Sequence, residues 1–235
     1  MTMTTAAVWP DAGVLAWDSA HERPQPDGMM RYSAEGMAPA LCAFPGGWAA
    51  AGGSYEVGMR AVGLLRSSGG GTLEELAERL APELNLAVAA AMTEDYDPSY
   101  SQTVMLTVAS GSLEAGMFQP ATGLTRWPAG ARVYIPPGVL YDDDALETAF
   151  DAFMARATPG ARAYAVLRAL AVFYERAAEL TPALSGNLRV GLLQRHRSGS
   201  WESVALTAKV SWLRRATDDE LTARLFSLQI SEVVQ

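Results

Sequence analysis

The chain of 235 residues has one cysteine, two histidines and one lysine, and each scarcity excludes a class of site. Cys42 alone cannot form an internal disulfide or a cysteine-based zinc site, and its apolar surroundings place it in the core. His21 and His196 cannot build a three-histidine metal centre, so neither a metal nor a cofactor is expected. Lys209 is the only lysine among 18 cationic residues.

Long apolar runs and a cationic leader are also missing. The longest uncharged stretch, residues 37–55, is rich in Gly and Ala and is broken by Pro45-Gly46-Gly47, which predicts two strands and a turn rather than a bilayer helix. Acidic residues outnumber basic residues by 26 to 18, which argues against a phosphate-binding surface. We therefore expect a cytoplasmic protein that binds neither nucleic acid nor membrane.

Hydropathy periods that alternate along the chain predict its organisation. Strand patterns fall at residues 4–16 (broken by a turn at 10–13), 38–52, 102–135, 188–194 and 204–212. Helix patterns fall at 57–65, at 72–92, after Asp143 or Asp144, from Thr158-Pro159 onward, and at 218–225. Thr72 and Glu75 form a capping-box pattern at the start of the second helix. Without repeats or linkers, residues 1–235 are expected to form one layered domain.

Three segments of the chain resemble the proteasome-type N-terminal nucleophile hydrolases. Residues 2–7 followed by 11–19 are similar to the threonine start and D-G-V-x-x-A-x-D hairpin of that family. Residues 48–53 are similar to its Ala-Gly strand, and residues 185–190 to its S-G-G strand entry. The likeness in element order covers nearly the whole chain.

The resemblance implies a fold, an assembly and a reaction. The fold would be α/β (α+β), a four-layer αββα sandwich of two antiparallel sheets flanked by helix pairs. The assembly would be a homo-oligomeric ring, with a peptide substrate and an unfoldase as candidate partners. The reaction would be peptide hydrolysis by Thr2, whose free α-amine can act as the base only after Met1 is removed.

Individual site residues follow from the same resemblance. Thr2 matches the nucleophile, Asp18 the aspartate that orients the family lysine, and Ser185 the serine that supports the threonine amine. The substrate cleft would be lined by His21, Glu22, Ala49, Ala51 and Gly53, with a backbone amide near Ala51 holding the oxyanion.

Three features depart from the family pattern. The family lysine should lie on the strand before the Ala-Gly hairpin, but Ala34 or Met37 stands there and Arg31 is the nearest cation. Arginine does not replace lysine in this role, because it stays protonated and needs a wider, forked site. The serine of a G-S-G segment near Pro136 and the aspartate before Ser185 are also missing.

Each candidate residue also has a simpler interpretation. Thr2 is also compatible with an ordinary terminal residue, and Asp18 with a carboxylate that caps a turn. Ser185 begins an ordinary turn, and His21 with Glu22 is compatible with a surface pair. Two main hypotheses for the function follow: a threonine-type peptidase that forms a ring, or a catalytically degenerate structural ring subunit. A small-molecule amidase is a third hypothesis.

Overall fold

The computed structural model describes residues 3–18, 21–24, 30–33, 41–94, 97–135, 143–156, 163–180, 184, 187–224 and 226–229. Six strands form the first sheet, in the spatial order β10-β1-β2-β11-β12-β13. Their bounds are β1 (Thr4–Trp9), β2 (Ala12–Asp18), β10 (Arg132–Ile135), β11 (Asn187–Arg195), β12 (Trp201–Lys209) and β13 (Phe226–Gln229). Every neighbouring pair in this sheet is antiparallel.

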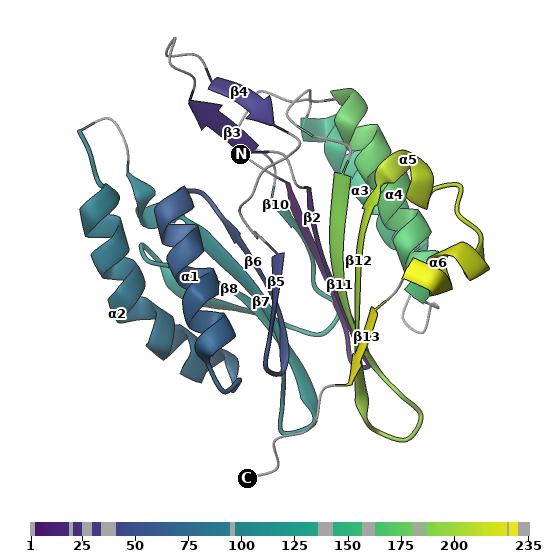
Figure 1. Cartoon of the computed structure of the whole chain (residues 1–235), viewed down its shortest axis with the longest axis horizontal. Helices are drawn as coiled ribbons and strands as arrows, with labels where there is room; N and C mark the ends of the chain where they lie inside the picture. Colours follow the sequence, from purple (N-terminus) through teal and green to yellow (C-terminus); the bar gives the residue numbers. More distant parts are fainter. Residues whose placement is uncertain are drawn as a thin grey trace.

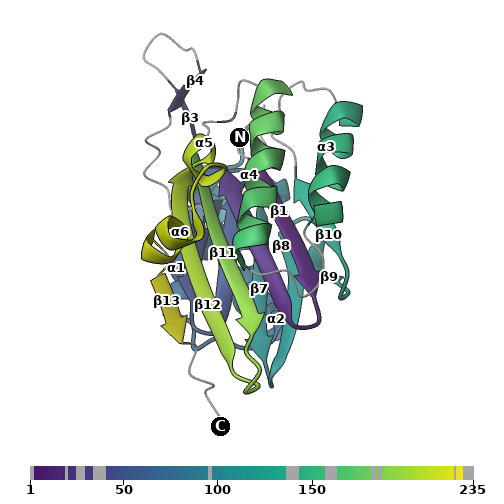
Figure 2. The ribbon, with the colours of Figure 1, turned by 90° about the vertical axis from the view of Figure 1, so that its right-hand side faces the viewer.

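Five strands form the second sheet, in the order β5-β6-β7-β8-β9, and all its pairs are antiparallel. Their bounds are β5 (Leu41–Phe44), β6 (Gly47–Gly52), β7 (Gln102–Ala109), β8 (Ser112–Gln119) and β9 (Gly123–Trp127). A separate hairpin pairs β3 (His21–Pro24) with β4 (Met30–Ser33). This hairpin lies beyond the end of the sheets at which the N-terminus is found (Figures 1 and 2).

Helix pairs cover the outer face of each sheet, so the expected four-layer αββα sandwich is confirmed (Figure 1). The second sheet is covered by α1 (Tyr55–Ser67) and α2 (Leu73–Ala91), and the first by α3 (Asp143–Arg156) and α4 (Ala163–Leu180). The described residues also form three short helices, namely η1 (Pro98–Tyr100), α5 (Val210–Leu213) and α6 (Asp218–Arg224). Among the described helices, none is long and apolar enough to cross a membrane.

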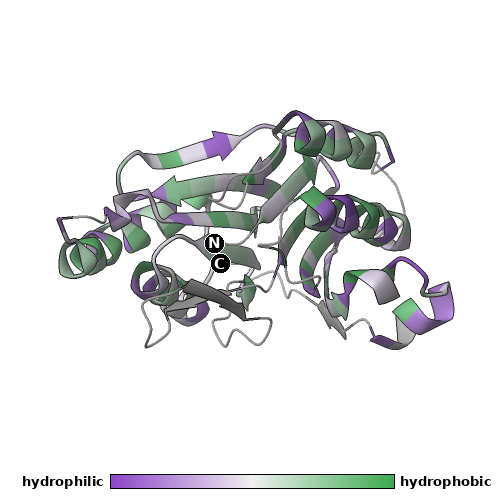
Figure 3. Cartoon of the chain, turned by 90° about the horizontal axis from the view of Figure 1, so that it is seen from above, coloured by the Kyte–Doolittle hydropathy of each residue, from purple (hydrophilic) through white to green (hydrophobic). Residues whose placement is uncertain are grey.

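Three apolar clusters fill the three spaces between the four layers. One packs α3 and α4, through residues such as Phe153 and Phe173, onto the first sheet. A second packs α1 and α2 onto the second sheet around Leu76 and Met105, and a third lies between the sheets. Figure 3 shows hydrophobic residues throughout the strands enclosed by the helix layers. Because both faces of β1 and β2 are covered, these strands are buried along almost their whole length.

Trp48 of β6 joins the two sheets across this inner cluster. Its indole Nε1 donates a hydrogen bond of 2.7 Å to the Ser203 hydroxyl oxygen on β12. Its ring lies against Gly191 of β11, where an added Cβ would stand 2.4 Å from the indole Cδ2. No side chain larger than hydrogen fits at Gly191 without moving Trp48.

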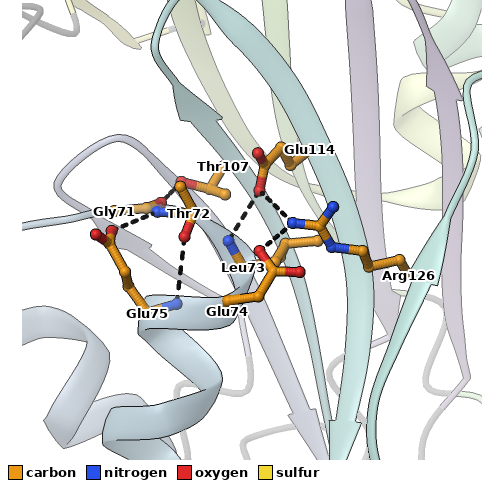
Figure 4. Close-up of polar contacts among 8 residues, drawn as sticks. All are labelled: Gly71, Thr72, Leu73, Glu74, Glu75, Thr107, Glu114 and Arg126. Atoms are coloured by element: carbon orange, nitrogen blue, oxygen red, sulfur yellow. Dashed lines mark hydrogen bonds and ion pairs between the residues drawn. The ribbon is translucent and has the colours of Figure 1, made fainter.

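The first turn of α2 is fixed by polar contacts to the second sheet (Figure 4). The Thr72 hydroxyl accepts a hydrogen bond from the Glu75 amide at 3.3 Å, and the Glu75 carboxylate accepts one from the Thr72 amide at 2.9 Å. This capping box is the one expected from the sequence. The Glu114 carboxylate of β8 accepts from the Leu73 amide at 2.9 Å and lies 3.7 Å from the Arg126 guanidinium of β9.

Two local predictions need correction. The strand expected over residues 204–212 is wrong at its end, because β12 ends at Lys209 and Val210–Leu213 form helix α5. The β3–β4 hairpin and the edge strand β13 have no counterpart in the predicted elements. The predicted start of the fourth helix, at Thr158-Pro159, lies outside the described residues.

Candidate functional site

Asp18 and the described neighbours of Thr2 and Ser185 lie at one end of the first sheet. The Asp18 amide donates a hydrogen bond of 3.1 Å to the Met3 carbonyl, so Asp18 is paired with the residue that follows Thr2. On its other side Asp18 pairs with Leu188, three residues after Ser185. Thr2 and Ser185 themselves lie outside the described residues. Strand register thus brings the immediate surroundings of all three predicted residues to one sheet end.

Asp18 is buried on the face of the sheet that is covered by α4. Its side chain is 1 % exposed and shares this face with Ala16 two residues earlier, because strand side chains alternate. The negative charge of the Asp18 carboxylate affects the ionisation of the Tyr174 phenol on α4. Burial raises the pKa of Tyr174 well above its usual value, and the negative charge of Asp18 raises that pKa further.

Tyr174 of α4 forms hydrogen bonds with the start of β1 and the residue before it, a role that the sequence pattern does not predict. Its hydroxyl donates to the Met3 carbonyl at 3.3 Å and lies 3.1 Å from the Thr5 hydroxyl oxygen. Because Tyr174 has one proton to donate, the Thr5 hydroxyl is the donor in the second contact. Tyr174 lies four residues after Leu170, on the same buried face of the helix, but helical spacing does not indicate its partner on β1.

Lys209 does not stand in for the missing family lysine. Leu188 pairs with both Asp18 and Ala208, so these three residues form one row across the sheet. Lys209 follows Ala208 and projects from the opposite face, since successive side chains alternate. Its strand is also two strands from β2, which corresponds to about 10 Å at ~4.8 Å per strand. Lys209 and Asp18 therefore cannot form an ion pair within one subunit.

The predicted substrate-binding residues fall in three places. His21 and Glu22 lie in β3, whose side chains are outside the described part of the chain. Ala49 and Ala51 are buried in the cluster between β6 and α1, so contact with a substrate would involve the backbone of β6. Gly53 follows β6 and is exposed, with φ +94° and an added Cβ only 2.7 Å from Ser101 Cα.

The sequence matches no protein-family model and no curated protein. Solved structures, in contrast, match over nearly the whole length of the chain. The structure described as the helical assembly of the Anbu complex from Pseudomonas aeruginosa is 15 % identical, with a TM-score of 0.65, and the match covers 94 % of each chain. This chain has the proteasome-like Anbu fold.

Two further Anbu structures support that assignment. Anbu from Yersinia bercovieri, described as an ancestral β-subunit, is 9 % identical with a TM-score of 0.60, over 99 % of this chain and 88 % of that chain. A mutant of Anbu from Hyphomicrobium sp. strain MC1 is 11 % identical with a TM-score of 0.62, over 95 % of this chain and 97 % of that chain. At these identities the likeness establishes a shared fold, and the expected fold class is confirmed.

Proposed function

We propose that the chain is a subunit of a proteasome-like homo-oligomeric ring and that it hydrolyses peptides with Thr2 as the nucleophile. The hydrogen bond between the Asp18 amide and the Met3 carbonyl carries this proposal, because it sets Asp18 beside the residue that follows Thr2. The match to Anbu over nearly the whole of each chain supports the proteasome-like subunit, and the helical assembly named for the Pseudomonas aeruginosa protein supports association between copies of the chain.

The proposed reaction begins when removal of Met1 frees the Thr2 α-amine. The amine takes the proton from the Thr2 hydroxyl, and the hydroxyl oxygen attacks the carbonyl carbon of the peptide. The carbon–nitrogen bond breaks, the amine product leaves with the proton, and an ester remains on Thr2. Water then hydrolyses the ester and regenerates the hydroxyl. Ser185 would support the Thr2 amine, and a peptide would enter beside Gly53 beneath His21 and Glu22.

A second candidate function is a catalytically degenerate ring subunit with a structural role. The observation that favours it is the position of Lys209, the only lysine, on the face of the sheet opposite Asp18. Without a lysine the Thr2 hydroxyl lacks the electrostatic assistance that lowers its proton affinity. General acid–base assistance typically contributes about 10²–10⁴ in rate, so its loss could abolish useful hydrolysis.

Three measurements on the purified chain separate these functions. Intact mass shows whether Met1 has been removed, and labelling by a peptide epoxyketone or β-lactone shows whether Thr2 reacts. For a hydrolase we expect the mass without methionine, labelling of wild type and Thr2→Ser, and none of Thr2→Ala. Retained Met1 or absence of labelling, together with an intact oligomer in native mass spectrometry, leaves the structural subunit. A monomer would overturn both ring readings.

A further inference from the structure

The face of the first sheet that is turned toward the second sheet is apolar at one end and carries a cationic residue at the other. Toward the β1–β2 turn the space between the sheets is apolar, with Leu193 of β11 and Trp201 of β12. Gly191 lies under Trp48, so Arg189, two residues earlier on the same strand, projects from the same face. At this opposite end of the sheet, Arg189 is paired directly with Trp17 of β2.

Trp17 carries a buried hydrogen-bond donor, its indole Nε1. The residue is 2 % exposed, and its Nε1 has no hydrogen-bond partner among the described residues. The indole extends toward the second sheet, where its Cη2 lies 3.6 Å from the position that a Cβ on Gly52 would occupy. A buried polar group left unsatisfied costs about 1–3 kcal/mol, so an acceptor supplied from outside would stabilise this arrangement.

Two cations lie beside this donor on the same face. Arg189 pairs with Thr207 of β12, so Lys209, two residues further on, is its diagonal neighbour at about 7–8 Å. Arg189 is half-buried and Lys209 is exposed. Within the described ranges neither forms a salt bridge, although the chain has 26 acidic against 18 basic residues.

We propose that Trp17, Arg189 and Lys209 form a binding site for a carboxylate-bearing ligand at the end of the first sheet where β2 ends. The three side chains offer donors and no acceptor, which is the complement of an anion. A carboxylate presents two coplanar oxygens to the guanidinium fork and retains a lone pair for the indole N–H.

The ligand class that fits is an acidic peptide segment, bound through a Glu or Asp side chain or through a C-terminal carboxylate. This proposal goes beyond peptide hydrolysis, because it requires binding only and holds for a catalytic and a non-catalytic subunit alike. It also gives Lys209, which does not take the place of the family lysine, a role in binding the ligand.

Isothermal titration calorimetry on the full chain tests the site. The probes are an acetylated, amidated pentapeptide with a central Glu, the same peptide with Gln, the Gln peptide with a free C-terminal carboxylate, and inorganic phosphate. We expect one or both carboxylate peptides to bind, and the neutral peptide and phosphate to bind at least tenfold more weakly. The two carboxylate probes distinguish a side-chain from a C-terminal source.

Variants locate the binding. Arg189→Gln should weaken the carboxylate peptide about 10- to 100-fold, Trp17→Phe about 2- to 10-fold, and Lys209→Gln about 2- to 5-fold. Arg195→Gln, at the far end of β11, is the matched control and should leave binding unchanged. Equal binding of the neutral peptide, equal binding of phosphate, or unchanged affinity in Arg189→Gln would each overturn the proposal.

Discussion

Removing the Tyr174 hydroxyl tests how the N-terminal strand is held. Tyr174→Phe keeps the ring, which packs against Phe173 with centroids 5.5 Å apart, and deletes only the buried oxygen. That oxygen makes two contacts, to the Met3 carbonyl at 3.3 Å and to the Thr5 hydroxyl at 3.1 Å. The Met3 carbonyl would keep only its bond from the Asp18 amide. The beginning of β1 should therefore loosen from α4.

The expected loss follows from the number of contacts. A buried hydrogen bond contributes about 0.5–1.5 kcal/mol net, so two bonds correspond to about 2 kcal/mol of unfolding free energy. For a chain of this size each kcal/mol shifts Tm by about 2–4 °C, so Tm should fall by about 4–8 °C. Urea unfolding followed by circular dichroism measures the free energy, and a thermal scan measures Tm. Tyr100→Phe, at a residue 64 % exposed, is the control and should stay within about 0.5 kcal/mol of wild type.

The same residue predicts the response to alkali. Burial and Asp18 raise the pKa of Tyr174 in the folded chain above its unfolded value of about 10. The stabilisation is therefore complete below about pH 10 and is lost as pH rises beyond that value. Tyr174→Phe lacks this titration, so its stability should fall less steeply above pH 10. If Tyr174→Phe were as stable as Tyr100→Phe at neutral pH, the buried hydroxyl would not hold the strand, and the reasoning would fail.

Three other perturbations have defined outcomes. Burial raises the pKa of the Cys42 thiol to about 11, so wild type should lose stability between pH 9 and 11, whereas Cys42→Ala should stay level until about pH 10 in urea titrations. Thr72→Ala should cost α2 about 1 kcal/mol through its lost cap, and Thr72→Ser should restore most of it by the same assay. Gly191→Ala should lower Tm by several degrees through its clash with Trp48, whereas Gly63→Ala on α1, where an added Cβ meets nothing within 4 Å, should raise it slightly. Equal effects at the two glycines would contradict the packing described between the sheets.

Local patterns predicted most of the elements, because turns, caps and periodicity depend on residues close together in the chain. The Pro10–Gly13 break, the Thr72–Glu75 capping box and the apolar spacing of α4 each depend on residues no more than about four positions apart in the chain. The sequence does not predict the β3–β4 hairpin or β13, because each of these strands has only four residues, and the alternation in Met30–Ser33 and Phe226–Gln229 is as short as a strand pattern can be. The sequence predicts that this strand continues beyond Lys209, because Val210 and Trp212 extend the apolar alternation. The chain instead forms helix α5 from Val210.

The order of strands and helices, the capping of α2 and the likeness to proteasome-type proteins were determined by the sequence itself. Which side chains meet was decided only by the tertiary structure. Thr5 and Tyr174 are 169 residues apart, and Trp17 and Arg189 become neighbours only through the register of β2 with β11. A shift of β11 by one residue against β2 would turn Arg189 to the helix-covered face, away from Trp17, because strand side chains alternate with a period of two. Register is fixed by the burial of whole faces, a property of the packed sheets and not of any short segment.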